Sequence, residues 1–425
     1  MSRRSGFVLA QIGHDLRAGM LVGPALITVT FGLLGALVVR LERGTSPPAW
    51  IPPLDTASAQ VVLGTIAGSM MTVVSITYSV LLMALSMASM QFSPRILVGF
   101  LRDRASQSTL GLFLGTFLYA LVVLRAVHGD PQAYSAPVAV VVAVALAFVS
   151  LASLVLFISR IAQGIQANHI ADRIAHETRA IMDEVLVGAV DEPAVDRLAP
   201  PENCRVVPAL RSGYVQLVDY DRLLAVADHH RTTLTILKAP GEYVVEGTPL
   251  ATVDVAEIPS TEIDEGFDFG PIRTMQQDVE YGLRQIVDIA LKAISPAVND
   301  PSTCVTCIDN LTSLLAYAAS RNDPVTTREG LAGGRLRMAR SSFGRLVDMC
   351  FHQIRQYGHG DLAVGLRLAR ALTDLAQVTE RPARRADLLR HAHLLEASLA
   401  GHFHADERHE LDRRLAKLRR SLEGG

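Results

Sequence analysis

The stretch that decides the fold is residues 56–94, TASAQVVLGTIAGSMMTVVSITYSVLLMALSMASMQFSP, which contains no Asp, Glu, Lys, Arg or His. A membrane-spanning helix needs about 20 mostly apolar residues, because the hydrocarbon layer is about 30 Å thick. A helix from about Val61 to Ser93 would be roughly 50 Å long at about 1.5 Å per residue. The sequence therefore predicts a helix that tilts strongly, or that continues into the cytoplasm before Pro94 ends it.

Three further apolar stretches lie near this one: about Ala18 to Val39, the segment between Arg104 and Arg125, and Pro137 to Ile158. A single stretch of this kind is also compatible with a buried helix of a soluble protein. Four in succession predict a mainly α membrane protein with a four-helix transmembrane domain over residues 1–160. No cleavable signal peptide is evident, so the first stretch is interpreted as a retained membrane helix.

The arginines in the short loops predict the orientation, because cytoplasmic loops carry an excess of Lys and Arg. The opposite side of the membrane would hold only three arginines: Arg40, Arg43 and Arg125. The predicted cytoplasmic side holds nine: Arg3, Arg4, Arg17, Arg95, Arg102, Arg104, Arg160, Arg173 and Arg179. We therefore expect an inner-membrane protein, multi-pass, with both termini in the cytoplasm.

Hydroxyl side chains recur along the second stretch at steps of three, four or seven residues, which places them on one face of a helix. They are Thr65, Ser69, Thr72, Ser75, Ser79, Ser86 and Ser93. One explanation is close helix packing, which small and hydroxyl residues permit. The other is the lining of a pore in a symmetric oligomer, where hydroxyls replace part of the hydration of an ion. Glycine pairs at GxxxG spacing, Gly19–Gly23 and Gly111–Gly115, also suggest close helix contacts.

No ionisable residue lies in the middle of any predicted span. Such residues are the usual mark of proton-coupled pumps and ion exchangers. Their absence argues against a classical secondary transporter and leaves open a passive channel. The predicted partners are therefore the lipid bilayer, further copies of the same chain, and a small ion or a cytoplasmic ligand.

A first block of motif residues comprises the loop Gln91-Phe92-Ser93-Pro94-Arg95, then Asp103, Gln107, Leu110-Gly111 and Gly115-Thr116-Phe117 with Tyr119. This block resembles a large family of bacterial predicted membrane proteins of unknown function. The resemblance continues in the C-terminal half with Asp278-Val279-Glu280-Tyr281-Gly282-Leu283-Arg284-Gln285, Asp288-Ile289-Ala290, Ser295-Pro296 and Asn299-Asp300-Pro301. It spans most of the chain to about residue 320. The resemblance implies the topology and supplies little mechanism.

The region after the spans predicts a cytoplasmic α+β part in three sections. Residues 161–202 indicate an amphipathic helix continuing from the fourth span, followed by a proline-containing linker. Residues 203–258 have short β-rich runs, and the run GEYVVEGTPL at 241–250 resembles a barrel-sandwich module in which glycine makes the turn. Residues 259–425 predict a helical domain, with a helix from near Met275 to Ile294 and a helical pattern from about Ile272 to the C-terminus.

The block Asn299-Asp300-Pro301 has two explanations. Asp300 suits an N-cap and Pro301 the first residue of the next helix. Alternatively, Asp288, Asn299 and Asp300 bind a cation such as Mg²⁺ or Ca²⁺, or a polar ligand, because these ions prefer oxygen ligands.

Several function classes lack sequence support. Cys304 and Cys307 form a CxxC at the start of a predicted helix, but a zinc site needs two more ligands, so chance spacing is the preferred interpretation. No phosphate loop, nucleophile elbow or nucleic-acid-binding motif is present, so we expect no cofactor, no metal site, no nucleic-acid partner and no enzyme activity. A membrane enzyme would have to use interfacial groups such as Arg95, Asp103 and Arg104, together with Asp288 or Asp300.

These observations favour a homo-oligomeric ion channel or conduction pathway, with the second span as the lining helix and a cytoplasmic regulatory domain. The alternative is a membrane-tethered sensor or interaction scaffold without transport, because the cytoplasmic region is large.

Overall fold

The computed structural model describes residues 22–43, 48, 51, 54–91, 104–128, 135–164, 166–185, 196, 198, 204–254, 258–321 and 326–423. The chain divides into two compact units, Met1–Gln166 and Ala167–Gly425. We call them the membrane unit and the C-terminal unit.

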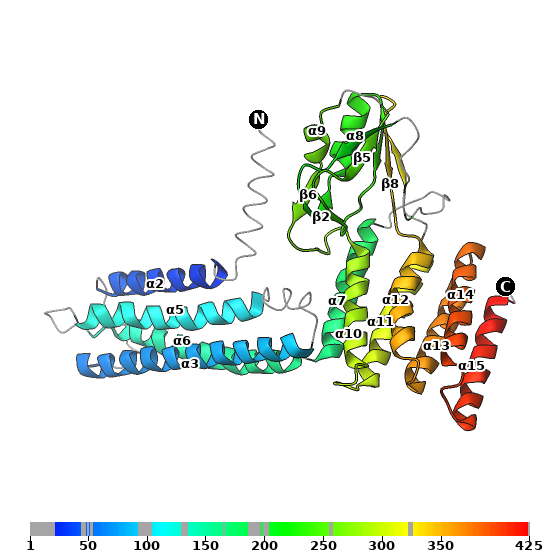
Figure 1. Ribbon diagram of the computed structural model, residues 1–425. Helices are drawn as coiled ribbons and strands as arrows, with labels where there is room; N and C mark the ends of the chain where they lie inside the picture. Colours follow the sequence, from blue (N-terminus) through cyan, green and yellow to red (C-terminus); the bar gives the residue numbers. More distant parts are fainter. Residues whose placement is uncertain are drawn as a thin grey trace. The chain divides into compact units, whose positions relative to one another are not determined.

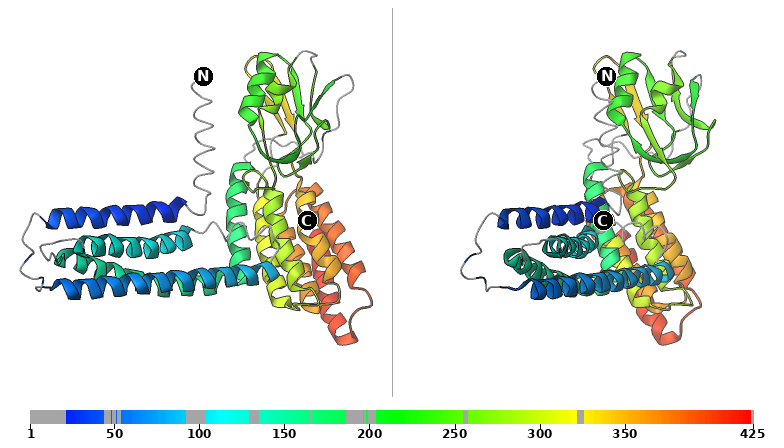
Figure 2. Two further views of the ribbon diagram at one scale, coloured as in Figure 1. Left: turned by 60° about the vertical axis from the view of Figure 1, so that its left-hand side comes forward. Right: turned by 90° about the vertical axis from the view of Figure 1, so that its left-hand side faces the viewer.

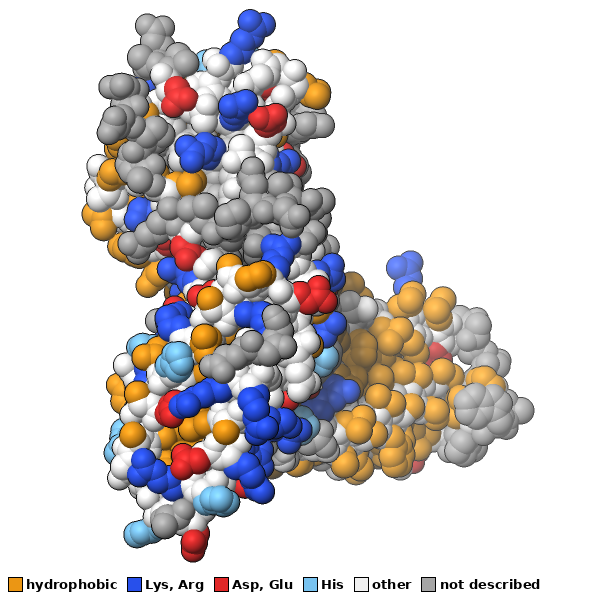
Figure 3. All heavy atoms as spheres, turned by 90° about the vertical axis from the view of Figure 1, so that its right-hand side faces the viewer, with side chains coloured by type: hydrophobic (Ala, Val, Ile, Leu, Met, Phe, Trp, Pro, Cys, Tyr) orange, Lys and Arg blue, Asp and Glu red, His pale blue; other side chains and the backbone are white. Residues whose placement is uncertain are grey.

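The membrane unit contains the four predicted apolar helices, each long and apolar enough to cross a membrane (Figure 1). They are α2 (Val22–Glu42), α3 (Thr56–Gln91), α5 (Arg104–His128) and α6 (Pro137–Gly164). On the side shown in Figure 3, hydrophobic side chains cover most of the described surface of this unit, as expected for contact with lipid. The prediction of four apolar spans is confirmed within the described residues.

Helix α5 packs against α2, α3 and α6 and is the centre of the membrane unit. Its Phe113, Tyr119, Ala120 and Val123 are fully buried. Glycines allow this close packing, because a side chain at Gly115 would begin 2.7 Å from the ring of Phe31 on α2. The Gly111–Gly115 pair therefore makes the close helix contact that its spacing indicates. Gly19 of the other pair lies outside the described residues.

The β part of the C-terminal unit consists of two sheets and two short helices, α8 (Tyr220–His229) and α9 (Ser260–Asp264). The larger sheet has the strand order β1 (Arg205–Pro208), β5 (Pro249–Val253), β3 (Thr233–Ile236), β8 (Arg335–Met338) and β7 (Thr327–Glu329). The smaller sheet has the order β4 (Tyr243–Val244), β2 (Gly213–Val218) and β6 (Phe267–Gly270). Neighbouring strands are antiparallel except for β3 and β8, which run parallel.

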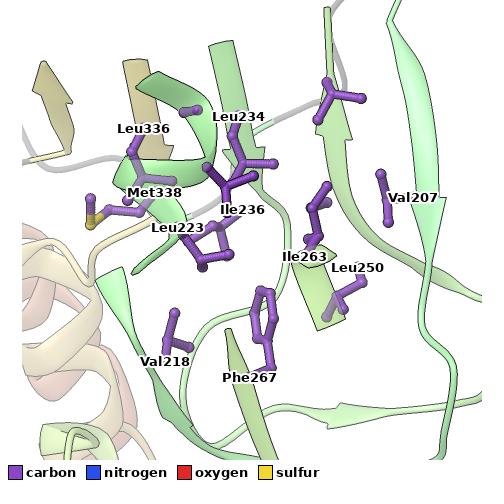
Figure 4. Packing of buried hydrophobic residues seen from close by; sticks show 14 of the residues in the cluster. Val207, Val218, Leu223, Leu234, Ile236, Leu250, Ile263, Phe267, Leu336 and Met338 are labelled. Carbon is purple, nitrogen blue, oxygen red and sulfur yellow. The ribbon is translucent and has the colours of Figure 1, made fainter. Parts of the chain in front are cut away.

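Glycine turns and apolar side chains explain this β part. Gly241 and Gly247 have φ of +87° and +82°, a region that residues with a Cβ rarely adopt, so they make the turns on either side of β4. Pro249 then opens β5. Apolar side chains from both sheets and from α8 and α9 meet in one core, including Leu223, Leu234 and Ile263 (Figure 4).

The remaining elements of the C-terminal unit are helices that pack side by side (Figure 2). Helix α7 packs against both α10 and α11, and α12 to α15 continue the array. Their bounds are α7 (Ala167–Val185), α10 (Val279–Ala293), α11 (Pro301–Ala319), α12 (Phe343–Tyr357), α13 (Leu362–Val378), α14 (Pro382–Leu399) and α15 (Ala405–Glu423).

Two details differ from the sequence predictions. The expected continuous helix from the fourth span does not form, because α6 ends at Gly164 and α7 begins at Ala167. The expectation of a helical pattern from about Ile272 onward was wrong for β7 and β8, which complete the larger sheet. Local periodicity did not reveal β8, since its partner β3 lies about a hundred residues earlier in the chain.

Candidate functional site

Helix α3 has two opposite faces. The buried face consists of residues three, four or seven positions apart: Ala59, Leu63, Ala67, Met70, Thr77 and Ala84. With about 100° between successive residues, the hydroxyl stripe falls on the other side of the helix. Its described members are all exposed: Thr65, Ser69, Thr72, Ser75, Ser79 and Ser86. Ser93 lies outside the described residues.

Within the membrane unit, the described residues leave the hydroxyl stripe exposed. A Cβ added at Gly64 or Gly68 would meet no atom within 4 Å. The hydroxyls of Thr65, Thr72 and Ser79 donate to the carbonyl oxygens of the residues four positions earlier, at 2.7, 3.2 and 2.9 Å. These bonds use the hydroxyl hydrogens and leave oxygen lone pairs able to accept from water or to face a cation.

Helix α5 uses the same residue types for internal packing. The Thr116 hydroxyl lies 3.0 Å from the Ser150 hydroxyl of α6, and both residues are buried. Tyr119 donates from its hydroxyl to the Ala139 carbonyl at 3.1 Å. Thr116 and Tyr119, with Gly111 and Gly115, belong to the first block that carries the family resemblance. These four residues of α5 hold the membrane helices together.

Glu42 is a buried carboxylate of the membrane unit that none of the sequence predictions included. It ends α2 with only 7% of its surface exposed. Its carboxylate accepts from the backbone N–H groups of Val138 and Ala139 at 2.7 and 3.2 Å. These N–H groups belong to the first turn of α6, where a negative charge is stabilised by unpaired donors and by the helix dipole. The lone acidic residue at the end of an apolar stretch was the available signal.

The predicted interfacial residues are only partly described. Arg95 and Asp103 lie outside the described residues, and Arg104 is the first residue of α5.

The Asn-Asp-Pro turn connects α10 with α11. Asn299 has a φ of +51°, and asparagine tolerates this left-handed conformation better than most residues. Asp300 is the N-cap of α11 and accepts from the Thr303 backbone N–H at 3.1 Å and from its hydroxyl at 2.6 Å. Pro301 is the first residue of α11. Each residue of the turn therefore has a structural purpose that follows from its own chemistry.

The other predicted member of this site is engaged elsewhere. Asp288 forms an ion pair with Arg284 of the same helix at 2.8 Å. Within the described ranges, no group of three or more His, Cys, Asp or Glu side chains has the arrangement of a metal site.

Cys304 and Cys307 are completely buried on α11. Burial raises the pKa of the Cys304 thiol to about 12, and it also raises the pKa of Cys307. A helix N-terminus would favour the thiolate, but the loss of hydration outweighs it here. Burial therefore favours the protonated thiol at both cysteines.

The second block of the family resemblance borders a small pocket of about 170 Å³ between the turn at Gly241 and the N-terminal ends of α10 and α12. Glu280 lies on this pocket with only 14% of its side chain exposed. Its carboxylate accepts from both the Nε and Nη2 of Arg345, the latter at 3.0 Å, and from the Ser341 hydroxyl at 2.6 Å. Burial opposes its ionisation, but these hydrogen bonds outweigh burial and lower the pKa of Glu280.

A second ion pair lies beside the first. Arg273 donates to both carboxylate oxygens of Asp278, at 2.5 and 2.9 Å, and Asp278 also caps α10 by accepting from the Tyr281 N–H at 3.0 Å. Burial raises the pKa of Asp278 by more than its donors lower it. Gly241 contacts this pair so closely that a Cβ there would lie 1.8 Å from the Asp278 carboxylate. The sequence showed Asp278 and Glu280 only as part of a resemblance, because Gly241 and Arg345, which contact them, come from distant segments.

Comparisons with known proteins agree with this architecture. Residues 17–374 match the family of predicted membrane proteins DUF2254. Uncharacterized proteins from Mycobacterium bovis and Mycobacterium tuberculosis are each 33% identical over 389 residues, which cover 86% of this chain and 74% of the relative. No solved structure matches.

The family match includes all four apolar helices and reaches α13, so it covers both the hydroxyl stripe of α3 and the pocket at Glu280. The chain therefore belongs to DUF2254, a family of predicted membrane proteins.

Proposed function

We propose that this chain forms a homo-oligomer in the inner membrane, with both termini in the cytoplasm, and that α3 lines a conduction pathway for small ions. The observation that supports the proposal is the exposed hydroxyl stripe of α3, opposite its buried face. A face of glycines and hydroxyls gives lipid chains little to pack against, whereas copies of α3 around an axis would place it towards water.

The length of α3 fits this role. Its 36 residues would extend over about 54 Å, more than the roughly 30 Å of hydrocarbon. The described helix also contains no charged side chain. A path lined by hydroxyls and carbonyl oxygens can replace part of an ion's hydration without a fixed charge, which suits passive flow rather than proton-coupled transport.

The C-terminal unit would serve as the regulatory domain. Helix α7 follows α6 after two residues and packs against α10 and α11. A movement of α10 or α11 would therefore act on the end of α6 through the covalent chain. In this proposal the protein has no catalytic residue and no cofactor.

The test is single-channel recording from purified full-length protein in liposomes. Ser79→Leu and Ser86→Leu replace exposed hydroxyls of the stripe with bulky apolar groups, and we expect each to reduce the single-channel conductance. Ala152→Leu is the matched control, because Ala152 is exposed on α6 and gains a comparable side chain. We expect its conductance to equal that of the unmodified protein.

Correctly inserted protein that gives no current across voltage, pH and membrane tension would contradict the proposal. So would currents that all three variants leave unchanged.

The second candidate function is a membrane-tethered sensor or scaffold, which the pocket at Glu280 favours because it lies between the β part and the helices. It predicts capture of a specific soluble partner by the full chain in the absence of ion flux. Loss of that capture in Glu280→Gln, with the stripe variants unaffected, would favour this candidate over a channel.

A further inference from the structure

The outer face of the larger sheet carries polar side chains in two rows. In an extended strand, successive side chains point to opposite faces. Leu234, Ile236, Leu336 and Met338 of β3 and β8 point into the core (Figure 4). The residues between them, such as Thr235 and Arg337, therefore point to the other face.

The register of the strands aligns these side chains. One row of cross-strand neighbours runs over β5, β3, β8 and β7. It consists, in that order, of Thr252, Thr235, Arg337 and Thr327. In the neighbouring row, Arg335 is paired with both Thr233 and Glu329. The backbone N–H of Asp254 donates to the Thr233 carbonyl at 3.3 Å, which brings Asp254 to the end of this second row.

A hollow of about 430 Å³ lies over these rows and is lined by Thr233, Asp254, Thr327, Glu329, Arg335 and Arg337. Its charges are balanced, with two arginines and two carboxylates. Arg335 and Glu329 neutralise each other through an ion pair of 3.1 Å. Arg337 and Asp254 form no ion pair with any residue of the described ranges. The hollow therefore contains one cation, Arg337 on β8, and one anion, Asp254 just after β5, that form no ion pair within the described residues.

The row of Arg337 also contains a buried hydroxyl. Thr235 is only 1% exposed, and its hydroxyl has no hydrogen-bond partner in the described part of the chain. Buried polar groups in folded proteins are nearly always hydrogen-bonded, so an unpaired one needs an explanation. Thr235 is the direct cross-strand neighbour of Arg337. Thr235 is not among the residues that line the hollow, so a ligand there would not reach its hydroxyl.

We propose that this face of the sheet binds a small zwitterion of the α-amino acid class. The carboxylate of the ligand binds the Arg337 guanidinium, whose planar donors suit two carboxylate oxygens. Its ammonium group faces Asp254, which lines the same hollow. A simple anion would leave Asp254 unmatched and would place two negative charges in one hollow, which makes a ligand with both charges the better fit.

The experiment measures binding to purified full-length protein in detergent by isothermal titration calorimetry. The probes are the twenty common L-amino acids, tested one at a time, with acetate and methylammonium as ligands that carry only one of the two charges. We expect at least one amino acid to bind and both single-charge probes to bind at least about tenfold more weakly.

Variants then assign the two ends of the ligand. Arg337→Gln and Asp254→Asn should each weaken amino-acid binding by about 10- to 100-fold, since each removes a hydrogen bond to a charged group. Thr235→Val changes a buried neighbour of Arg337 that does not line the hollow, and it should leave the affinity unchanged. Arg328→Gln is the matched control, because it removes an arginine that pairs with Asp221 from the other face of β7. Its affinity should be unchanged.

The melting temperature of each ligand-free variant shows whether it is folded. Binding of none of the amino acids to the folded protein would overturn the proposal. Acetate binding as tightly as the amino acids, or Asp254→Asn binding as tightly as the unmodified protein, would also overturn it. Because this test measures binding and not current, its result is independent of whether α3 conducts ions.

Discussion

Helices α3 and α5 contain the same kinds of small residue in opposite environments. On α5, Gly115 lies against Phe31 and Thr116 is hydrogen-bonded to Ser150 inside the membrane unit. On α3, Gly68 has no atom near its missing Cβ and Thr72 is exposed. The two helices differ in what surrounds these residues and not in their composition.

This difference shows that a small residue in a membrane helix has no fixed role. Glycine and threonine stabilise a helix pair where a second helix approaches, and they form an accessible polar face where none does. The same distinction between packed and open positions applies to the carboxylate caps and the cysteines of this protein, so each can be tested with a matched pair of variants.

The largest difference in stability between a packed and an open position is expected for the glycines. In Gly115→Leu the new side chain overlaps the Phe31 ring, and overpacking of this kind should lower the free energy of unfolding by about 3 kcal/mol. In Gly68→Leu nothing obstructs the new side chain, so the change should stay within about 0.5 kcal/mol. Thermal unfolding of the monomer in detergent measures both. An equal loss in the two variants would show that the α3 face is packed as well.

Substitutions of the two carboxylate caps, Glu42 and Asp300, should differ by a smaller amount in their effect on stability. Glu42→Gln replaces a buried carboxylate that accepts from two N–H groups, and we expect a loss of about 2 kcal/mol. Asp300→Asn alters a half-buried cap, and asparagine caps almost as well as aspartate, so the loss should be about 0.5 kcal/mol. Chemical denaturation measures both values. Equal losses would contradict the importance of burial.

The cap at Asp300 also makes a testable contribution to the pH dependence of the free energy of unfolding. Hydrogen bonds from Thr303 lower the pKa of Asp300 in the folded state. Its stabilisation is therefore complete above the unfolded pKa of about 3.9 and is lost as the pH falls through the lower folded pKa. Asp300→Asn should remove this part of the acid sensitivity. An identical stability profile for variant and parent below about pH 4 would refute this assignment.

The smallest effect concerns reactivity without a change in stability. Cys304, Cys307 and Cys350 are fully buried, whereas Cys204 is half-buried. Since burial raises the pKa of each of the three buried thiols, they should react with a thiol reagent at pH 8 only after denaturation. Mass spectrometry after timed labelling identifies the modified residues. Rapid labelling of Cys304 in the native protein would show that α11 opens.

Much of the membrane unit could be predicted from the sequence. The four apolar stretches identified the four helices because the thickness of hydrocarbon sets their length and composition. The cap at Asp300 was also predictable, since the relevant atoms lie within three residues of each other. The β part was predicted as a small module over residues 203–258, and β8 was missed because it pairs with β3 across a long intervening segment.

The sequence by itself determined where the helices of the membrane unit lie and which residues share the hydroxyl stripe of α3, because helical spacing and hydropathy are local properties. Only the tertiary structure decided that this stripe is exposed, that Glu42 caps α6, and that Thr235 and Arg337 are neighbours. These outcomes depend on which distant segments approach each other. Such contacts are set by the packing of the whole chain, and local patterns do not contain them.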